Sequence, residues 1–197
     1  MKHYSQKDPR WANQKLGTCN TTLRASGCFV TALAMQYGDR IKVPPTSRKW
    51  LESVATVYDD GTVEATPAIL DFIFTKEKLY SSGCNVVSTI MTKRLGLENS
   101  GRSGAQPPYQ CIAETDNFKR FGVPQHFFVV LPDGRILDPL DPPDSPPKKN
   151  PYHIVSYRLI KTKKESFIEP VNPPKEPTVK ELLVGVADTV SKVIKKL

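Results

Sequence analysis

The hydrophobic positions fall into one long helical stretch and a later group of strands. From Ser26, the sequence SGCFVTALAMQYG places apolar residues on nearly every side of a predicted helix that ends at Gly38. A helix that is apolar all round belongs in the interior, so we expect it to be central. Weaker patterns predict helices over 47–57, 67–78 and 86–95, and turn-forming residues predict loops over 1–25 and 96–110.

The second half of the chain changes to the pattern of β-strands. Residues 126–131 (HFFVVL) are dense in aromatic and β-branched side chains, and Pro-Asp-Gly then separates them from a second short strand over 135–139. A further strand is predicted over 152–160. Helices first and strands later predict an α+β domain over residues 1–162, with N-terminal helices packed on a C-terminal antiparallel sheet.

Prolines mark the end of this domain. They are concentrated over 139–151 and again over 170–177, and this pattern predicts a Pro-rich linker over 163–177. Apolar residues then recur every three or four positions over 178–197, which predicts an amphipathic C-terminal helix. This helix either folds back on its own domain or serves for docking or self-association.

Composition excludes several classes of protein. Of 197 residues, 39% are hydrophobic, yet no apolar run reaches the roughly 18 residues of a membrane-spanning helix. The start, MKHYSQKDPR, lacks the apolar core of a classical signal peptide, so we expect a cytoplasmic or virion-associated protein. The net charge of +8 favours anionic partners, but no nucleic-acid-binding signature accompanies it, so no nucleic-acid partner is expected.

The four cysteines do not have metal-binding spacing. There is no C-x-x-C pair and no paired histidine, so we predict neither a metal site nor a cofactor. An even number of cysteines allows two disulfides, but without a secretory signal reduced thiols are the expected state.

Cys28 stands where a nucleophilic thiol would be activated. It follows Gly27 and begins the apolar helix, so free backbone N–H groups and the positive end of the helix dipole favour the thiolate. Cys84 is a rival, because it also follows Ser-Gly ahead of a helical pattern. The alternative for either residue is an inert buried cysteine.

A thiolate nucleophile needs a base, and His126 is the best candidate of three histidines. His3 lies near the terminus and is expected to be solvated, and His153 is expected at the surface of an edge strand. Asp138 follows His126 across a turn and can orient the imidazole, with Asp141 as a rival acid.

The length of the hairpin loop decides whether His126 and Asp138 share a face of the sheet. A two-residue loop would pair Val129 with Asp138 and place the two side chains on opposite faces. A three-residue loop, Pro132-Asp133-Gly134, pairs Phe128 with Asp138 and places them diagonally on one face. Proline suits the first turn position and glycine the left-handed closing position, so the longer loop is predicted.

Three segments of the chain together resemble the papain-like cysteine peptidases that are related to bacteriocin-leader-processing peptidases, in their stand-alone bacterial and phage branch. These segments are YSQKDPRWANQKLG, SGCFVTALAM and HFFVVLPDGRILDP. The segments occur in that family's order over residues 4–139. The resemblance implies a papain-like fold with Cys28 as nucleophile, His126 as general base and then acid, and Asp138 as orienting carboxylate. It implies that Gln6 donates an amide N–H to the oxyanion together with the Cys28 backbone N–H. Gln6 stands further from the cysteine than in the transporter-linked peptidases, and no transporter segment is present.

The expected function is therefore a cysteine-dependent amide-bond hydrolase acting on a protein, a peptide or a cell-wall peptide. The basic charge would assist approach to an anionic wall, as in a peptidoglycan hydrolase. The alternative is a non-catalytic binding or structural module on a peptidase-like fold, within a phage particle or another assembly, to which residues 178–197 would dock.

Overall fold

The computed structural model describes residues 2–38, 40–43, 50–82, 84–86, 97–116 and 125–162. In this part of the chain the fold is mixed α+β, with an antiparallel sheet of six strands and few helices. The helices are α1 (Leu23–Ser26), α2 (Cys28–Tyr37) and α4 (Pro67–Lys76). The strands are β1 (Arg40–Lys42), β2 (Thr62–Glu64), β3 (Leu97–Ser103), β4 (Cys111–Thr115), β5 (His126–Val130), β6 (Arg135–Leu137), β7 (Lys148–Lys149) and β8 (Ser156–Thr162).

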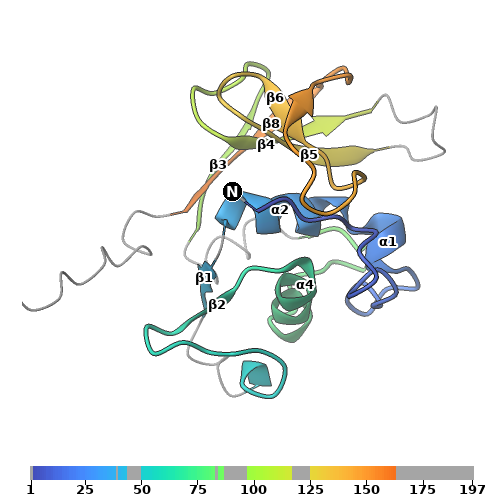
Figure 1. The fold of residues 1–197 in the computed structure, drawn as a ribbon, viewed down its shortest axis with the longest axis vertical. Helices are drawn as coiled ribbons and strands as arrows, with labels where there is room; N and C mark the ends of the chain where they lie inside the picture. Colours follow the sequence, from blue (N-terminus) through green and yellow to red (C-terminus); the bar gives the residue numbers. More distant parts are fainter. Residues whose placement is uncertain are drawn as a thin grey trace, which may run out of the picture. The chain divides into compact units, whose positions relative to one another are not determined.

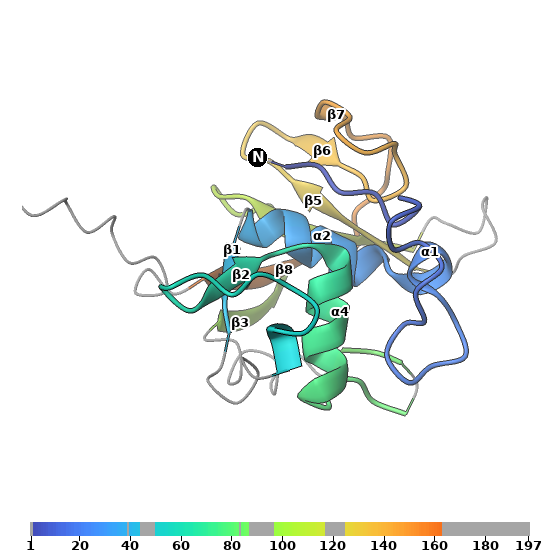
Figure 2. The same cartoon turned by 60° about the horizontal axis from the view of Figure 1, so that its bottom comes forward.

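The main sheet has the strand order β3-β8-β4-β5-β6-β7, and β1 and β2 pair separately. Helix α2 lies between this sheet and α4 (Figure 1). The view in Figure 2 shows the same layering, with β5 on one side of α2 and α4 on the other. Helix α2 thus covers one face of the sheet, α4 packs on the far side of α2, and the largest apolar cluster contains residues from the sheet and from both helices.

Helix α2 confirms the predicted central helix. Seven of its ten residues are buried, and they point in all directions around the helix axis. Gly38 ends the helix with a φ of 83°, a left-handed conformation that glycine adopts without steric cost. A helix buried on every side is a rigid support for the residue at its first position.

Helix α4 confirms the helix predicted over 67–78, and its start follows from its sequence. The Thr66 side chain accepts a hydrogen bond from Ile69 N at 3.2 Å, and Pro67 occupies the first turn, where its missing N–H costs nothing. The helix ends at Lys76, two residues before the predicted end.

The hairpin between β5 and β6 has the predicted three-residue loop. Val129 pairs with Leu137 and Val130 with Ile136, a register that places Asp138 opposite residue 128. Gly134 closes the loop with a φ of 80°, so it occupies the left-handed closing position that was predicted for it. His126 and Asp138 therefore lie on the same face of the sheet.

Other expectations for secondary structure were wrong. Residues 97–103, predicted as loop, form the edge strand β3. Its pairing with β8 shifts register between Asn99 and Arg102, and Gly101 within this irregularity has a φ of 93°. The helix predicted over 47–57 ends at residue 51, and residues 52–57 are not helical. The last strand begins at Ser156 rather than 152.

Several predictions fall outside the described residues. They are the helix over 86–95, apart from Val86, the linker over 163–177 and the helix over 178–197. In the part of the chain that the structure describes, no helix has the length and apolar character needed to cross a membrane.

The expectation of reduced thiols is wrong for two of the four cysteines. Cys19 and Cys84 form a disulfide, with Cα atoms 5.9 Å apart. The buried carboxylate of Asp71 explains the approach, because it accepts hydrogen bonds from Gly17 N at 2.9 Å and from Tyr80 Oη at 2.7 Å. Asp71 thus fastens the loop that carries Cys19 to the segment that leads to Cys84.

Candidate active site

Cys28 is the first residue of α2, at a junction that requires glycine. A Cβ atom on Gly27 would lie 2.4 Å from Leu23 O, so no larger residue fits between α1 and α2. The Gly27 N–H donates to that same carbonyl at 2.8 Å. The Cys28 thiol is free and partly exposed, and Cys84 is excluded as a rival nucleophile by its disulfide.

The hairpin places His126 and Asp138 in direct contact. His126 begins β5 and Asp138 follows β6, and both side chains are almost completely buried. The His126 Nε2–H donates to Asp138 Oδ1 at 2.9 Å. Because this bond occupies Nε2, Nδ1 is the ring nitrogen left for the hydrogen bond that joins His126 to the Cys28 side chain. The structure therefore brings the three predicted residues together.

The electrostatics of the site follow from these contacts. Burial by itself lowers the pKa of His126, but the hydrogen bonds and charges of Asp138 and Cys28 outweigh it and raise that pKa to about 9. Burial raises the pKa of Asp138, yet the His126 imidazolium and further hydrogen-bond donors hold it well below its usual range. The arrangement thus favours a protonated His126 held between an anionic carboxylate and a sulfur atom.

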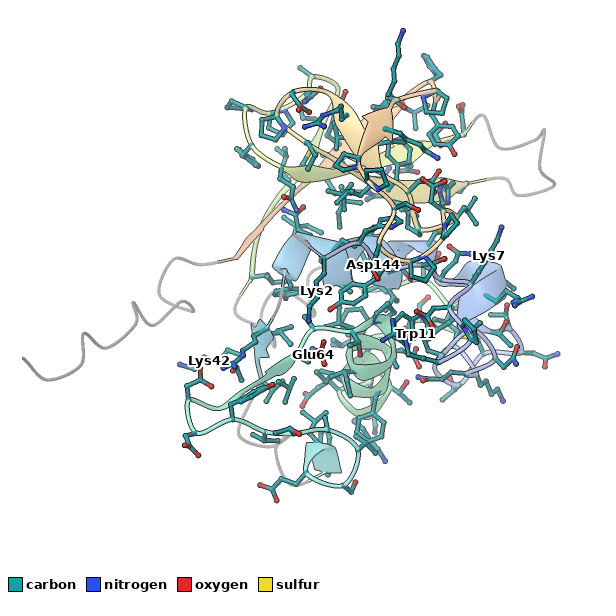
Figure 3. All side chains as sticks on the ribbon, in the orientation of Figure 1. Lys2, Lys7, Trp11, Lys42, Glu64 and Asp144 are labelled. Atoms are coloured by element: carbon teal, nitrogen blue, oxygen red, sulfur yellow. A yellow bond between two sulfur atoms is a disulfide. The ribbon has the colours of Figure 1, made fainter. Side chains whose placement is uncertain are left out.

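Gln6 lies on an N-terminal segment that hydrogen bonds and a salt bridge fasten to the rest of the domain. Its backbone N–H donates to Pro139 O at 2.8 Å, directly after Asp138 in the chain. Lys2, nearer the terminus, forms a salt bridge of 2.8 Å with Glu64, and the two labelled side chains meet in Figure 3. The segment therefore carries Gln6 to the site from a distant part of the sequence.

The side chain of Gln6 interrupts the backbone hydrogen bonding ahead of Cys28. Gln6 Nε2 donates to Arg24 O at 2.6 Å, and Gln6 is only 4% exposed. Arg24 O is four residues before Cys28, so in a continuous helix it would accept the Cys28 N–H. Within the described residues, the Cys28 N–H has no hydrogen-bond partner. The Gln6 amide uses one of its two N–H hydrogens for Arg24 O, so its second hydrogen and the Cys28 N–H remain as candidate donors to an oxyanion.

The remaining histidines have different surroundings from each other. His3 was expected to be solvated, but it is 5% exposed and its Nε2 is 2.9 Å from Asp138 O. The cause is the N-terminal segment, which runs against the turn after β6 and buries His3 there. His153 lies at the surface, as expected, although it precedes β8 rather than starting the strand.

The rival acid Asp141 is paired with Lys148. Its Oδ1 accepts a hydrogen bond from Lys148 Nζ at 2.6 Å, and that same Nζ lies 3.3 Å from Asp138 Oδ2. Tyr152 also donates to Asp138 Oδ2, at 2.5 Å. Sequence reasoning missed Lys148 and Tyr152, because nothing in the stretch KKNPY indicates which carboxylate it will face.

The described residues contain no group of three or more His, Cys, Asp or Glu side chains that could hold a metal ion. The site is instead made of one sulfur, one imidazole, one carboxylate and amide N–H donors. This set supports proton transfer and nucleophilic attack at a carbonyl carbon.

Comparison of the chain with protein-family models, curated proteins and solved structures finds no match. The interpretation of this site therefore depends on its own geometry and chemistry.

Proposed function

We propose that this protein is a cysteine-dependent amide-bond hydrolase with a papain-like arrangement of its active site. The observation that carries the proposal is the chain of contacts from Cys28 through His126 to Asp138. A buried imidazole with a carboxylate on one nitrogen and a partly exposed sulfur on the other is the arrangement that nucleophilic thiol catalysis needs.

The reaction would proceed in two steps. The Cys28 sulfur attacks the carbonyl carbon, and the electron pair of the C=O bond moves to the oxygen, where the Gln6 amide and the Cys28 N–H stabilise it. As the C–N bond breaks, His126 gives its proton to the leaving amine and a thioester remains on Cys28. Water then attacks the thioester carbon, His126 accepts a proton from that water, and the C–S bond breaks to release the acid and the thiolate.

The substrate in this proposal is an extended protein or peptide, or the peptide of a bacterial cell wall. The net charge of +8 supports an anionic substrate or an anionic surface that carries it. Two assays separate the classes: cleavage of a peptide library followed by mass spectrometry, and loss of turbidity of purified cell walls.

The direct test of the site compares two free thiols in the same protein. At pH 7, iodoacetamide should alkylate Cys28 at least about 100-fold faster than Cys111, because only the former is exposed and paired with an imidazole. Cys111 is fully buried, and burial raises its pKa to about 12. Peptide mapping by mass spectrometry measures both rates. Equal slow labelling of the two cysteines, with no cleavage in either substrate assay, would leave the binding module as the better interpretation.

The dependence of hydrolysis on pH should show an alkaline limit near pH 9. His126 must carry a proton to deliver it to the leaving amine, and its pKa of about 9 means that the proton is present below that pH and lost above it. The value of kcat/KM for an amide substrate, measured from pH 6 to pH 10.5, should therefore fall as the pH rises through about 9. A fall centred near the ordinary histidine value of 6.5 would contradict the coupling of His126 to Asp138 and Cys28.

A further inference from the structure

Both oxygens of the Asp138 carboxylate are engaged by hydrogen-bond donors. Oδ1 accepts from His126 Nε2 and from Leu140 N, each at 2.9 Å. Oδ2 accepts from Tyr152 Oη at 2.5 Å and lies 3.3 Å from Lys148 Nζ. The carboxylate thus divides its negative charge between the imidazole on one side and a phenol and an ammonium group on the other.

The two donors to Oδ2 are held in place by the sheet and by a turn. Lys148 pairs with Ile136 in the β6–β7 ladder, next to the end of β6 from which Asp138 emerges. Tyr152 N donates to Asn150 Oδ1 at 2.9 Å, which fixes the turn after β7. The Tyr152 ring also packs against Phe128, with centroids 5.0 Å apart, on the face of the sheet that carries His126.

The division of charge matters because His126 must release its proton in the proposed reaction. A carboxylate that bears its whole charge toward an imidazolium holds the proton strongly and makes the imidazolium a weak acid. Donors on the opposite oxygen draw part of that charge away. We infer that Tyr152 and Lys148 are positioning residues that share the charge of Asp138 and so make His126 acidic enough to protonate the leaving amine. This inference rests on the proposed function.

A substitution at Asp141 tests this inference, because it should shift the pKa of His126 in the opposite direction to substitutions at Lys148 and Tyr152. The Asp141 carboxylate shares the Lys148 ammonium group with Asp138, so it reduces the positive charge that Lys148 directs at the site. Removing Lys148 or the Tyr152 hydroxyl should raise the pKa of His126, whereas removing the charge of Asp141 should lower it. The titratable and charged groups that contact His126 or Asp138 are Cys28 from α2, Lys148 from β7, Tyr152 before β8 and His3 from the N-terminal segment, and Asp141 lies on the far side of Lys148.

The experiment is an NMR titration of the His126 ring nitrogens in full-length protein carrying Cys28→Ala as the common background. Tyr152→Phe and Lys148→Met should each raise the pKa of His126 by about one unit, the effect of one charge or charged hydrogen bond at this range. Asp141→Asn should lower it. Lys148→Arg keeps the charge and should restore the background value.

Hydrolysis provides a second measurement, with Cys28 present. Lys148→Met and Tyr152→Phe should lower kcat for an amide about 10-fold, with the alkaline limit moved to higher pH. They should change kcat for a nitrophenyl ester much less, because that leaving group needs no proton. A purely structural role would disorder Asp138, move the limit to lower pH and slow both substrates equally, which would overturn the inference.

The outcomes also separate the inference from the proposed function. The titration uses a protein without the nucleophile, so it reports on His126 whether or not the wild type hydrolyses amides. Upward shifts in Lys148→Met and Tyr152→Phe beside an inactive wild type would contradict the hydrolase proposal alone. If Lys148→Met and Tyr152→Phe fold but leave the pKa of His126 unchanged or lower it, the inference is overturned. If either of these two variants fails to fold, Asp141→Asn decides the inference, because it should lower that pKa.

Discussion

Replacing Cys28 with serine is expected to lower the rate of amide hydrolysis by at least about 10⁴-fold. The substitution keeps the size and position of the side chain at the start of α2, but a hydroxyl group is a far weaker acid than a thiol. His126 then cannot hold the transferred proton against an alkoxide as it does against a thiolate. The measurement is kcat/KM with the best amide substrate from the peptide and cell-wall assays.

Cys111→Ala is the matched control, because Cys111 is the other free cysteine of the described residues and is fully buried in the smaller apolar cluster. It should keep kcat/KM within a factor of about two, since substitutions away from a site leave its chemistry intact. Thermal melts of both variants show whether either has lost its fold. A serine variant that keeps more than a few per cent of the activity, or activity that disappears with Cys111 instead, would refute the assignment of the nucleophile.

Replacing Gln6 with alanine is expected to lower kcat by about 10²- to 10³-fold, the usual effect of losing an oxyanion donor, with little change in KM. The structure adds a second cause. Gln6 Nε2 occupies Arg24 O at 2.6 Å, the carbonyl that a continuous helix would offer to the Cys28 N–H. Without the glutamine, that N–H can turn to Arg24 O, and both donors to the oxyanion are lost together.

Hydrogen exchange distinguishes this double loss from the loss of one donor. The Cys28 amide should exchange more slowly in Gln6→Ala than in the wild type, because it gains an intrahelical hydrogen bond. Ser5→Ala is the control on the same segment, since it removes the hydrogen bonds of the Ser5 hydroxyl with Pro139 O and Lys7 N, each of 3.2 Å, and leaves Gln6 in place. An alanine variant at position 6 with undiminished kcat would show that the oxyanion is stabilised elsewhere.

The elements that the sequence predicts well are those whose signals are local. Helix α2 is specified by consecutive apolar residues between two glycines, and the β5–β6 hairpin by aromatic and β-branched residues around Pro-Asp-Gly. The hairpin register follows from loop length, and with it the shared face of His126 and Asp138. These steps need no knowledge of what packs against the segment.

Edge strand β3 shows where local signals fail. An edge strand needs only one hydrogen-bonded neighbour, so polar residues, glycine and an irregularity of register are tolerated there, and the alternating pattern is lost. Its pairing with β8 brings together residues about sixty positions apart, which no pattern within either segment indicates. The same holds for the Cys19–Cys84 disulfide, whose halves meet through the buried Asp71.

By itself, then, the sequence determined the central helix, the hairpin and the candidacy of Cys28, His126 and Asp138, because helix periods, turn residues and side-chain chemistry act over a few neighbouring positions. Only the tertiary structure decided that His3 is buried beside Asp138, that Asp141 serves Lys148, and that Gln6 takes the carbonyl of Arg24. Each of these contacts joins a flexible polar side chain to a group whose approach depends on how the whole domain packs. That packing is a property of the complete fold and is not encoded at any one position.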